Sequence, residues 1–234
     1  IAAGAAVSTA TIASPAADGS AVASGANVWH AGVAPAANIL AYRIAGIDPS
    51  DNTPGTSVSD FILAAGDLAA IARQQNVVAL NHSVGSDSVF ADANCGNSLT
   101  TFPDLTVNPP RASVSWDNSA QVAAIDTLTA LNVAVVNSAG NSGSRNVNSS
   151  PGCLDGVVSV SATANDDTVA AYSNVSPGRT DLFAPGGDSL TSGGAIIAPS
   201  ADGAGVNTAV YEAKQGTSMA APMVTGAWAL VRQL

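Results

Sequence analysis

Three loops of the sequence carry side chains that could act on a carbonyl group, and one of them contains Ser218. This serine lies between a glycine-containing turn and the small residues 219–221, which begin a helix. It could cap that helix or be an ordinary loop hydroxyl. It could also be a nucleophile, because its developing oxyanion would meet backbone N–H groups and the positive end of the helix dipole. The small neighbours would let a peptide backbone approach closely.

The other two loops each follow an apolar run. Asn141 could be a turn residue that tolerates a left-handed conformation, or it could aim its side-chain amide at an oxyanion. The segment Ser83-Val84-Gly85 could simply end a strand, or its backbone could form an exposed edge that pairs with an extended peptide. Each loop therefore has a structural and a functional interpretation.

The elements that would position these loops alternate between short β-branched runs and alanine-rich stretches. This pattern predicts an α/β fold with buried parallel strands. A strand–helix rhythm of this kind predicts one doubly wound sheet, with sites beyond the carboxyl ends of its strands. We therefore expect chemistry in the loops after Leu80, Val136 and Val210. The expected strands are residues 38–44, 77–80, 133–138, 157–162 and 181–184, and the expected helices are residues 16–26, 60–75, 118–131 and a C-terminal helix through Leu230.

We expect residues 1–234 to form a single domain, because no internal repeat or long linker divides the chain. Residues 86–115 are the least regular part. They contain Cys95 and several prolines and phenylalanines but little periodicity, which indicates a surface insertion.

The composition excludes several classes of protein. Hydrophobic residues make up 47% of the chain and charged ones 10%, which is too apolar for a disordered chain. Seven basic and 17 acidic residues give a formal net charge of −10. Nucleic-acid binding needs basic residues to displace counterions from phosphates, so we expect no nucleic-acid partner. No apolar stretch reaches the roughly 18–20 residues of a membrane span.

Four segments together resemble the subtilisin-like serine proteases. Residues 216–222 (GTSMAAP) look like the nucleophile motif of that family almost letter for letter, and residues 135–143 (VVNSAGNSG) are similar to its oxyanion-asparagine segment. Residues 78–85 (VALNHSVG) resemble the strand that lines its substrate groove, and residues 32–37 (GVAPAA) the stretch after its histidine helix. The order and spacing are compatible with the family, and the resemblance covers nearly the whole chain.

This resemblance implies a serine endopeptidase on a three-layer, doubly wound, mostly parallel sheet flanked by helices, with a polypeptide as its substrate. Ser218 would attack the scissile carbonyl, and Asn141 would donate its amide to the tetrahedral oxyanion together with the Ser218 backbone N–H. The backbone of residues 83–85 would pair with the substrate, and residues 139–141 would form a wall of the primary specificity pocket. The implied substrate-binding residues are Ser83, Val84, Gly85, Ala139 and Gly140.

The chain departs from the family where the general base should be. The family has a histidine in a helix-opening H-G-[ST]-x-V-A motif, and residues 18–23 (DGSAVA) match it with Asp18 in the histidine position. The family's aspartate motif would lie before Ile1, and the family usually continues beyond Leu234. A carboxylate with a pKa of about 4 is a much weaker base at neutral pH than imidazole. We therefore expect this chain to be nearly inactive.

Neither histidine of the chain is expected to replace the missing base. His30 should pack in a connecting loop, and His82 should be a satisfied structural histidine on the groove strand. Two hypotheses follow. Retention of Ser218 and Asn141 favours a peptidase, whereas Asp18 favours a catalytically inactive subtilisin-like domain with a binding or structural role. A lipase-type hydrolase is disfavoured, because residues 216–220 (GTSMA) lack the second glycine of G-x-S-x-G.

The remaining expectations concern environment and cofactors. The near absence of lysine and the abundance of small polar residues favour an extracellular protein, and we favour a disulfide between Cys95 and Cys153 over two free buried thiols. The reaction requires no cofactor. Calcium is possible, but no acidic cluster has convincing ligand spacing, and Asp166-Asp167 and the pair Asp48 and Asp51 should be solvated turn acids.

Overall fold

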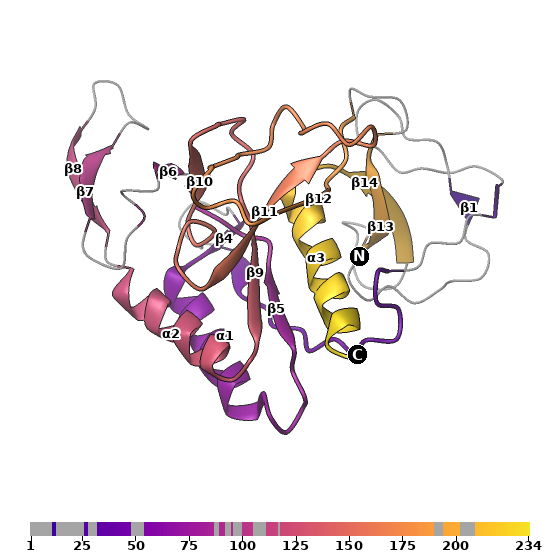
Figure 1. Cartoon of the computed structure of the whole chain (residues 1–234), viewed down its shortest axis with the longest axis horizontal. Coiled ribbons are helices and arrows are strands. Elements are labelled where there is room, and N and C mark those ends of the chain that lie inside the picture. Colours follow the sequence, from indigo (N-terminus) through magenta and orange to yellow (C-terminus); the bar gives the residue numbers. More distant parts are fainter. Residues whose placement is uncertain are drawn as a thin grey trace.

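A four-stranded parallel sheet forms the centre of the molecule (Figure 1). The computed structural model describes residues 11–12, 26–27, 32–47, 54–86, 89–91, 95, 100–104, 111–116, 118–189, 194–201 and 209–234. The sheet order is β12-β11-β9-β5, and each neighbouring pair is parallel. Its strands are β5 (Ala79–His82), β9 (Ala134–Ser138), β11 (Val157–Thr163) and β12 (Leu182–Pro185).

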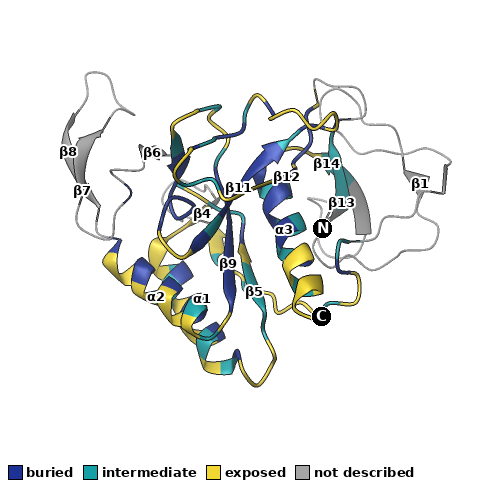
Figure 2. Ribbon diagram, viewed as in Figure 1, coloured by how far each residue is buried: buried dark blue, intermediate teal, exposed yellow. Residues whose placement is uncertain are grey.

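Helices cover both faces of this sheet. Helices α1 (Val58–Ile71) and α2 (Ser119–Ala130) pack on one face, and α3 (Thr217–Val231) packs on the other. The outer faces of α1 and α2 are exposed, whereas β9 between the layers is buried (Figure 2). This arrangement confirms the predicted three-layer α/β fold. None of the helices within the described ranges is long and apolar enough to cross a membrane.

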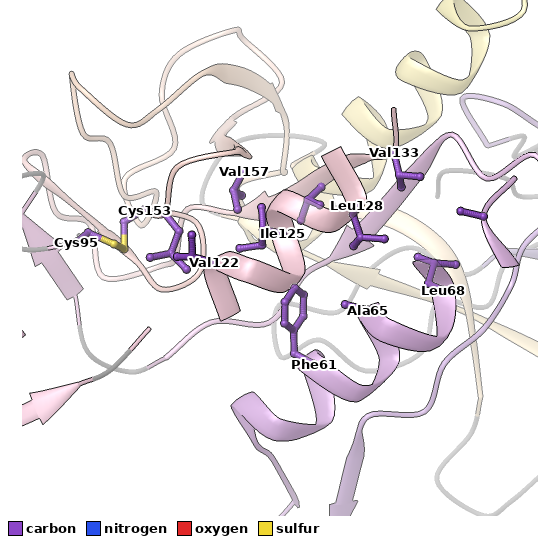
Figure 3. Packing of buried hydrophobic residues seen from close by; sticks show 13 residues of the cluster. Phe61, Ala65, Leu68, Cys95, Val122, Ile125, Leu128, Val133, Cys153 and Val157 are labelled. Atoms are coloured by element: carbon purple, nitrogen blue, oxygen red, sulfur yellow. A yellow bond between two sulfur atoms is a disulfide. The ribbon is translucent and has the colours of Figure 1, made fainter. Parts of the chain in front are cut away.

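The alternation of side chains along β9 and its preceding residue divides the core into two. Val133 and Val135 pack with residues of α1 and α2, whereas Ala134 and Val136 pack with α3. Successive side chains of a strand point to opposite faces, so one buried strand supplies both cores. Figure 3 shows the first core, in which Phe61 and other side chains of α1 face those of α2.

The capping and the apolar spacing of α1 explain why the helix forms where it does. Ser57 is the N-cap of α1 and forms two reciprocal hydrogen bonds with Asp60. The Asp60 N–H donates to Ser57 Oγ at 3.2 Å, and the Ser57 N–H donates to Asp60 Oδ2 at 3.0 Å. Such a capping box satisfies N–H groups that have no carbonyl partner within the helix. Phe61, Ala65 and Leu68 then recur at helical spacing and are all buried.

The disulfide between Cys95 and Cys153 lies at the edge of the first core, as Figure 3 shows. Its Cα atoms are 5.7 Å apart, and both cysteines are buried. The pairing that we favoured from the sequence is therefore confirmed. The bond ties the segment around Cys95 to the loop that precedes β11.

Shorter strands form antiparallel pairs outside the main sheet. These pairs are β1–β2, β3–β4, β6–β10, β7–β8 and β13–β14. Their bounds are β1 (Thr11–Ile12), β2 (Ala26–Asn27), β3 (Ala45–Ile47), β4 (Pro54–Thr56), β6 (Val89–Ala91), β7 (Thr100–Asp104), β8 (Arg111–Trp116), β10 (Val147–Ser149), β13 (Ile196–Ala201) and β14 (Ala209–Lys214).

The strand predicted at residues 38–44 is wrong. These residues form no strand, and Ile39 and Leu40 are 68% and 46% exposed. A strand needs a hydrogen-bonded neighbour, but within the described residues the sheet ends at β5. Only Tyr42 of this run packs against the first core, and its hydroxyl donates to Asp67 at 2.6 Å.

Two further expectations need correction. Residues 86–116 contain the strands β6, β7 and β8, so the described part of this segment is more regular than we expected, while the surface insertion at residues 86–115 stays a prediction. Strand β14, which contains Val210, belongs to a hairpin with β13 and not to the parallel sheet. The expected helix at residues 16–26 lies almost entirely outside the described residues. The other predicted strands and helices of the main fold agree with the structure to within a few residues.

Candidate active site

Ser218 lies in the first turn of α3, directly opposite the end of β5. Its Oγ donates to the Ser83 carbonyl at 3.1 Å, and Ser83 Oγ donates to the Ser218 carbonyl at 3.1 Å. Pro222, one turn later, has no N–H to offer the Ser218 carbonyl, and the Ser83 hydroxyl supplies the donor instead. The proline inside the helix therefore frees an acceptor that joins α3 to the sheet.

Asn141 follows β9 and meets the residue before Ser218. Its Oδ1 accepts from both the N–H and the hydroxyl of Thr217, each at 2.9 Å. A backbone N–H can only donate, so these bonds fix the orientation of the amide and leave Nδ2 as the free donor end. The Thr217 hydroxyl oxygen accepts in turn from the Gly140 N–H at 3.2 Å. Asn141 itself is exposed.

Asn174 holds the loop that carries Asn141. This residue is completely buried, and its Nδ2 donates to the Ala139 carbonyl at 3.1 Å. Its Oδ1 accepts from the N–H groups of Ser142 and Ser144 at 2.9 and 3.1 Å. The backbone on both sides of Asn141 is thus fixed by one buried amide.

The three loops surround a pocket of about 290 Å³. Five of the predicted site residues line it: Ser218, Asn141, Ser83, Gly85 and Gly140. The other lining residues are Ser86, Ser138, Ser142 and Ser149, so none of these nine residues has an ionisable carboxyl, amino or imidazole side chain. The pocket lies where β5 and β9 end, as expected for a site beyond the carboxyl ends of parallel strands.

Two predicted substrate-binding residues do not line this pocket. Val84 lines a neighbouring pocket of about 150 Å³, together with Phe61 and Gln121. Ala139 is completely buried, and its carbonyl accepts from Ser149 and Asn174. Ala139 therefore holds the surrounding loop rather than the pocket surface.

His82 is buried beside the site, with 8% of its surface exposed. One ring nitrogen, Nδ1, lies 2.7 Å from Asn137 Oδ1, and the ring meets Phe61 edge-on at 4.8 Å between centroids. Asn137 Nδ2 donates to the Ser138 carbonyl at 2.8 Å, so its Oδ1 must accept and His82 Nδ1 carries the proton. Burial lowers the pKa of His82, which the hydrogen bond to Asn137 partly offsets. Asp18 and His30 lie outside the described residues.

The acidic residues that we expected in turns can be described in part. Asp166 accepts from the Thr168 N–H at 3.1 Å and from the Thr168 hydroxyl at 2.6 Å, and these bonds lower the pKa of its carboxyl. Asp166 is therefore a turn acid, whereas Asp48 and Asp51 lie outside the described residues. The part of the chain that is described contains no group of three or more His, Cys, Asp or Glu side chains that could hold a metal ion.

Three residues that shape the site, Thr217, Asn174 and Ser149, were not predicted from the sequence. Thr217 is part of the serine motif, so its proximity to Ser218 was visible, but its contact with Asn141 spans 76 positions. Asn174 and Ser149 stand in segments without any motif, and no sequence signal could have found them.

Comparisons with known proteins agree with this geometry. Residues 6–234 match the sequence model of the subtilase family. The chain belongs to the subtilase family. An intracellular serine protease of Paenibacillus polymyxa is 35% identical over 115 residues, which are 47% of this subtilase and 31% of that protein.

Three solved structures illustrate the shared fold. A protease of Pseudoalteromonas arctica has a TM-score of 0.63 at 26% identity, covering 87% of this chain and 52% of that one. The epidermin leader peptide processing serine protease of Staphylococcus aureus has a TM-score of 0.58 at 22% identity, with 88% and 49% covered. A cold adapted subtilisin-like serine proteinase has a TM-score of 0.55 at 24% identity, with 86% and 56% covered. This subtilase thus spans about half the length of these solved relatives.

Proposed function

We propose that this subtilase domain is the nucleophile-bearing part of a serine endopeptidase. The observation that carries the proposal is that Ser218 and Asn141, from two distant segments, line one pocket. In this proposal the Ser218 hydroxyl attacks the scissile peptide carbonyl after a general base removes its proton. The base would come from outside the described residues, because the described histidine, His82, is bonded to Asn137.

The developing negative charge on the carbonyl oxygen would be stabilised by Asn141 Nδ2 and the Ser218 backbone N–H. Two observations support this assignment. The bonds from Thr217 leave the Nδ2 end of the amide free, and the Ser218 N–H lies in the first turn of α3, where no carbonyl stands four residues earlier in the helix. The helix dipole adds partial positive charge at the same point.

The substrate would lie extended beside residues 83–85. The Ser83 carbonyl accepts a hydrogen bond from the Ser218 hydroxyl. A peptide bound beside residues 83–85 would therefore lie next to that hydroxyl. The proposed substrate is a polypeptide, and the net charge of −10 disfavours nucleic acid as a partner. The proposed chemistry uses a hydroxyl, an amide and backbone donors and therefore needs no cofactor.

Asp18 supports a second candidate, a subtilase domain that binds peptides without cleaving them. A fluorophosphonate probe distinguishes the two, because it reacts covalently with an activated serine. The unmodified protein, the Asp18→His variant and the Ser218→Ala variant should be treated in parallel, with Ser59→Ala, an exposed serine on α1, as the matched control.

Labelling that Ser218→Ala abolishes and Ser59→Ala retains would support the peptidase and exclude the binding role alone. Absence of labelling in both the unmodified protein and Asp18→His would overturn the peptidase proposal. Labelling of Asp18→His alone would mean that the site is built for catalysis and that Asp18 switches it off.

We also propose that the protein works in an oxidising environment outside the cell. The buried Cys95–Cys153 bond supports this, because disulfides persist in secreted proteins and are rare in the cytosol. Thiol titration of the protein purified from its natural host under non-reducing conditions should find no free cysteine. A full complement of two thiols would contradict the proposal.

A further inference from the structure

A chain of side-chain hydrogen bonds joins helix α3 to the end of strand β5. The Thr225 hydroxyl donates to Asn81 Oδ1 at 3.1 Å. Asn81 Nδ2 donates to Ser83 Oγ at 3.1 Å, and Ser83 Oγ donates to the Ser218 carbonyl at 3.1 Å. Ser218 and Thr225 are seven positions apart, which is about two turns, so they lie on the same side of α3. The chain therefore starts and ends on the helix and passes through the strand.

The Ser218 carbonyl fixes the direction of these bonds. A carbonyl can only accept, and Pro222, one turn later, has no N–H to offer it. The Ser83 hydroxyl has a single proton, which goes to this carbonyl, so the Ser83 oxygen must accept from Asn81. The Asn81 amide therefore directs Nδ2 at Ser83 and Oδ1 at Thr225.

Apolar packing already holds the body of α3 on the sheet. Successive side chains of β5 point to opposite faces, so Leu80 packs against the first core and Ala79 against the second, on the side of α3. Asn81 follows Ala79 on that same side. Neither Asn81 nor Thr225 lines the candidate active-site pocket. Because apolar packing has no preferred direction, the hydrogen bonds add what it lacks at the point where the helix begins.

We infer that Asn81 is a positioning residue, which together with Thr225 directs the Ser83 hydroxyl at the Ser218 carbonyl and so fixes the proposed nucleophile. The Ser218 hydroxyl donates in return to the Ser83 carbonyl at 3.1 Å, so the two serines are bonded in both directions. Misplacing a reacting group by about 1 Å can cost about 10²-fold in rate. Asn81 acts through Ser83 and not on the substrate. This inference deepens the proposed function and rests on it.

Pairwise isotope labelling observes the Ser218 carbonyl directly, whether or not the protein is active. The chain has two methionines, Met219 after Ser218 and Met223 after Pro222. A protein labelled with ¹³C at serine carbonyls and ¹⁵N at methionine therefore gives a single cross-peak in an HNCO spectrum, from Ser218 and Met219. The ¹³C signal of a carbonyl moves upfield when the carbonyl loses a hydrogen-bond donor.

Asn81→Asp is the main test. It keeps the acceptor that faces Thr225 but replaces the amide donor with a carboxylate oxygen, which draws the Ser83 hydroxyl away from Ser218. We expect the Ser218 carbonyl signal to move upfield, as it should in Ser83→Ala, which removes the donor outright. Asn146→Asp adds the same charge at another exposed asparagine and should leave the signal unchanged. An unchanged signal in Asn81→Asp or in Ser83→Ala would overturn the inference.

Two variants of Thr225 test the start of the chain. In Thr225→Val the Asn81 amide can rotate and offer Oδ1 to Ser83, so the signal should move upfield by less than in Asn81→Asp. Thr225→Ser retains the hydroxyl and should keep the signal of the unmodified protein. The Thr225 hydroxyl also lies 3.1 Å from the Ala221 carbonyl. An unchanged signal in Thr225→Val would mean that this hydroxyl bonds only within α3, and would overturn its part in the inference.

The link to catalysis is tested in whichever form the fluorophosphonate probe labels, the unmodified protein or Asp18→His. In that form Asn81→Asp should slow labelling at least about tenfold, and Asn146→Asp should not. With a peptide substrate, kcat should fall while KM changes little, because Asn81 does not line the pocket. An unchanged rate beside a shifted carbonyl signal would overturn the positioning role. If neither form is labelled, the proposed function is overturned, and the carbonyl signal still decides whether Asn81 orients Ser83.

Discussion

At the scale of single residues, the site depends on a short chain of hydrogen bonds that runs from Gly140 through Thr217 to Asn141. Thr217 donates twice to Asn141 and accepts once from Gly140, so it joins the start of α3 to the loop after β9. This bonding turns the Asn141 amide so that its donor end is free. The Ser218 hydroxyl and the proposed oxyanion donor are therefore positioned by the same residue.

Asn141→Ala should slow catalysis, because the proposed role of Asn141 is in the transition state. It should also cost some stability, because the buried Thr217 N–H and hydroxyl lose their acceptor. In a form of the protein that hydrolyses peptides, kcat should fall about 10²–10³-fold, a figure measured for the corresponding donor of a subtilisin. KM should change little. The exposed Asn146→Ala is the matched control. A comparable fall in the control, or no fall in Asn141→Ala, would refute the assignment.

Thr217→Val should destabilise the protein and loosen the site together. Thr217 is completely buried, and valine would remove the hydroxyl that bonds to Gly140 and Asn141. The free energy of unfolding in urea should fall by about 1–3 kcal/mol, the usual cost of leaving buried polar groups without partners. Thr217→Ser retains the hydroxyl and should lose much less. Equal losses in the two variants would mean that the hydroxyl contributes no more than the methyl group, and would contradict this explanation.

At the scale of elements, two parallel strands bring the loops together. His82 and Asn137 are paired across β5 and β9, and their side chains are hydrogen-bonded to each other. Each is followed in the chain by a residue that lines the pocket, Ser83 after His82 and Ser138 after Asn137. The ends of the two strands are thus fixed to one another just where the chain leaves the sheet.

The buried His82 should make the stability of the protein depend on pH. Its lowered pKa means that the folded chain binds fewer protons than the unfolded chain, whose histidine has a pKa of about 6.5. Stability should therefore fall as the pH drops from about 7.5 through 6.5 toward the folded-state pKa. Urea unfolding at several pH values would show this. His82→Gln, which cannot titrate, should flatten the curve in this window, and an unchanged slope would contradict the explanation.

Loss of the disulfide should destabilise the fold, whether the bond is removed by mutation or by reduction. The bond closes a separation of 58 residues, for which the chain-entropy relation gives about 4 kcal/mol. The double variant Cys95→Ala and Cys153→Ala should lower the urea midpoint accordingly. Reduction of the native protein should cause a similar shift. If neither treatment moves the midpoint, the bond does not constrain the unfolded chain.

At the scale of the whole molecule, the sheet separates two hydrophobic cores. The first core lies between the sheet and the helices α1 and α2, and the second lies between the sheet and α3, which carries Ser218. Small residues let α3 approach closely, since Ala220 and Ala221 are both completely buried against the strands. Ser218, the proposed nucleophile, is thus placed by helix-to-sheet packing.

Ile125→Ala should test this separation. Ile125 is fully buried in the first core, so its truncation should cost about 2–5 kcal/mol of unfolding free energy. Under conditions in which the variant remains folded, peptide binding in the candidate pocket should be unchanged, because the loss lies across the sheet from α3. Weaker peptide binding by the folded variant would show that the two cores are coupled.

Local signals in the amino-acid sequence were enough to predict the fold class, most of the central elements and the candidate nucleophile. Helices α1, α2 and α3 and the four parallel strands follow from alanine-rich stretches and short β-branched runs, which depend only on neighbouring residues. Ser218 and Asn141 stand in contiguous segments that resemble those of a known family. Such signals are readable without knowing what lies across the sheet.

The surroundings of these residues are set by contacts that exist only in the folded chain. The apolar run at residues 38–44 has strand-like composition, yet Ile39 and Leu40 remain exposed, because burial requires a neighbour that the run itself does not encode. The contact of Thr217 with Asn141 and the position of Ser149 between Gly85 and Gly140 likewise join distant segments. Packing and hydrogen bonding across such separations arise when the sheet assembles, so the shape of the pocket is a property of the folded chain.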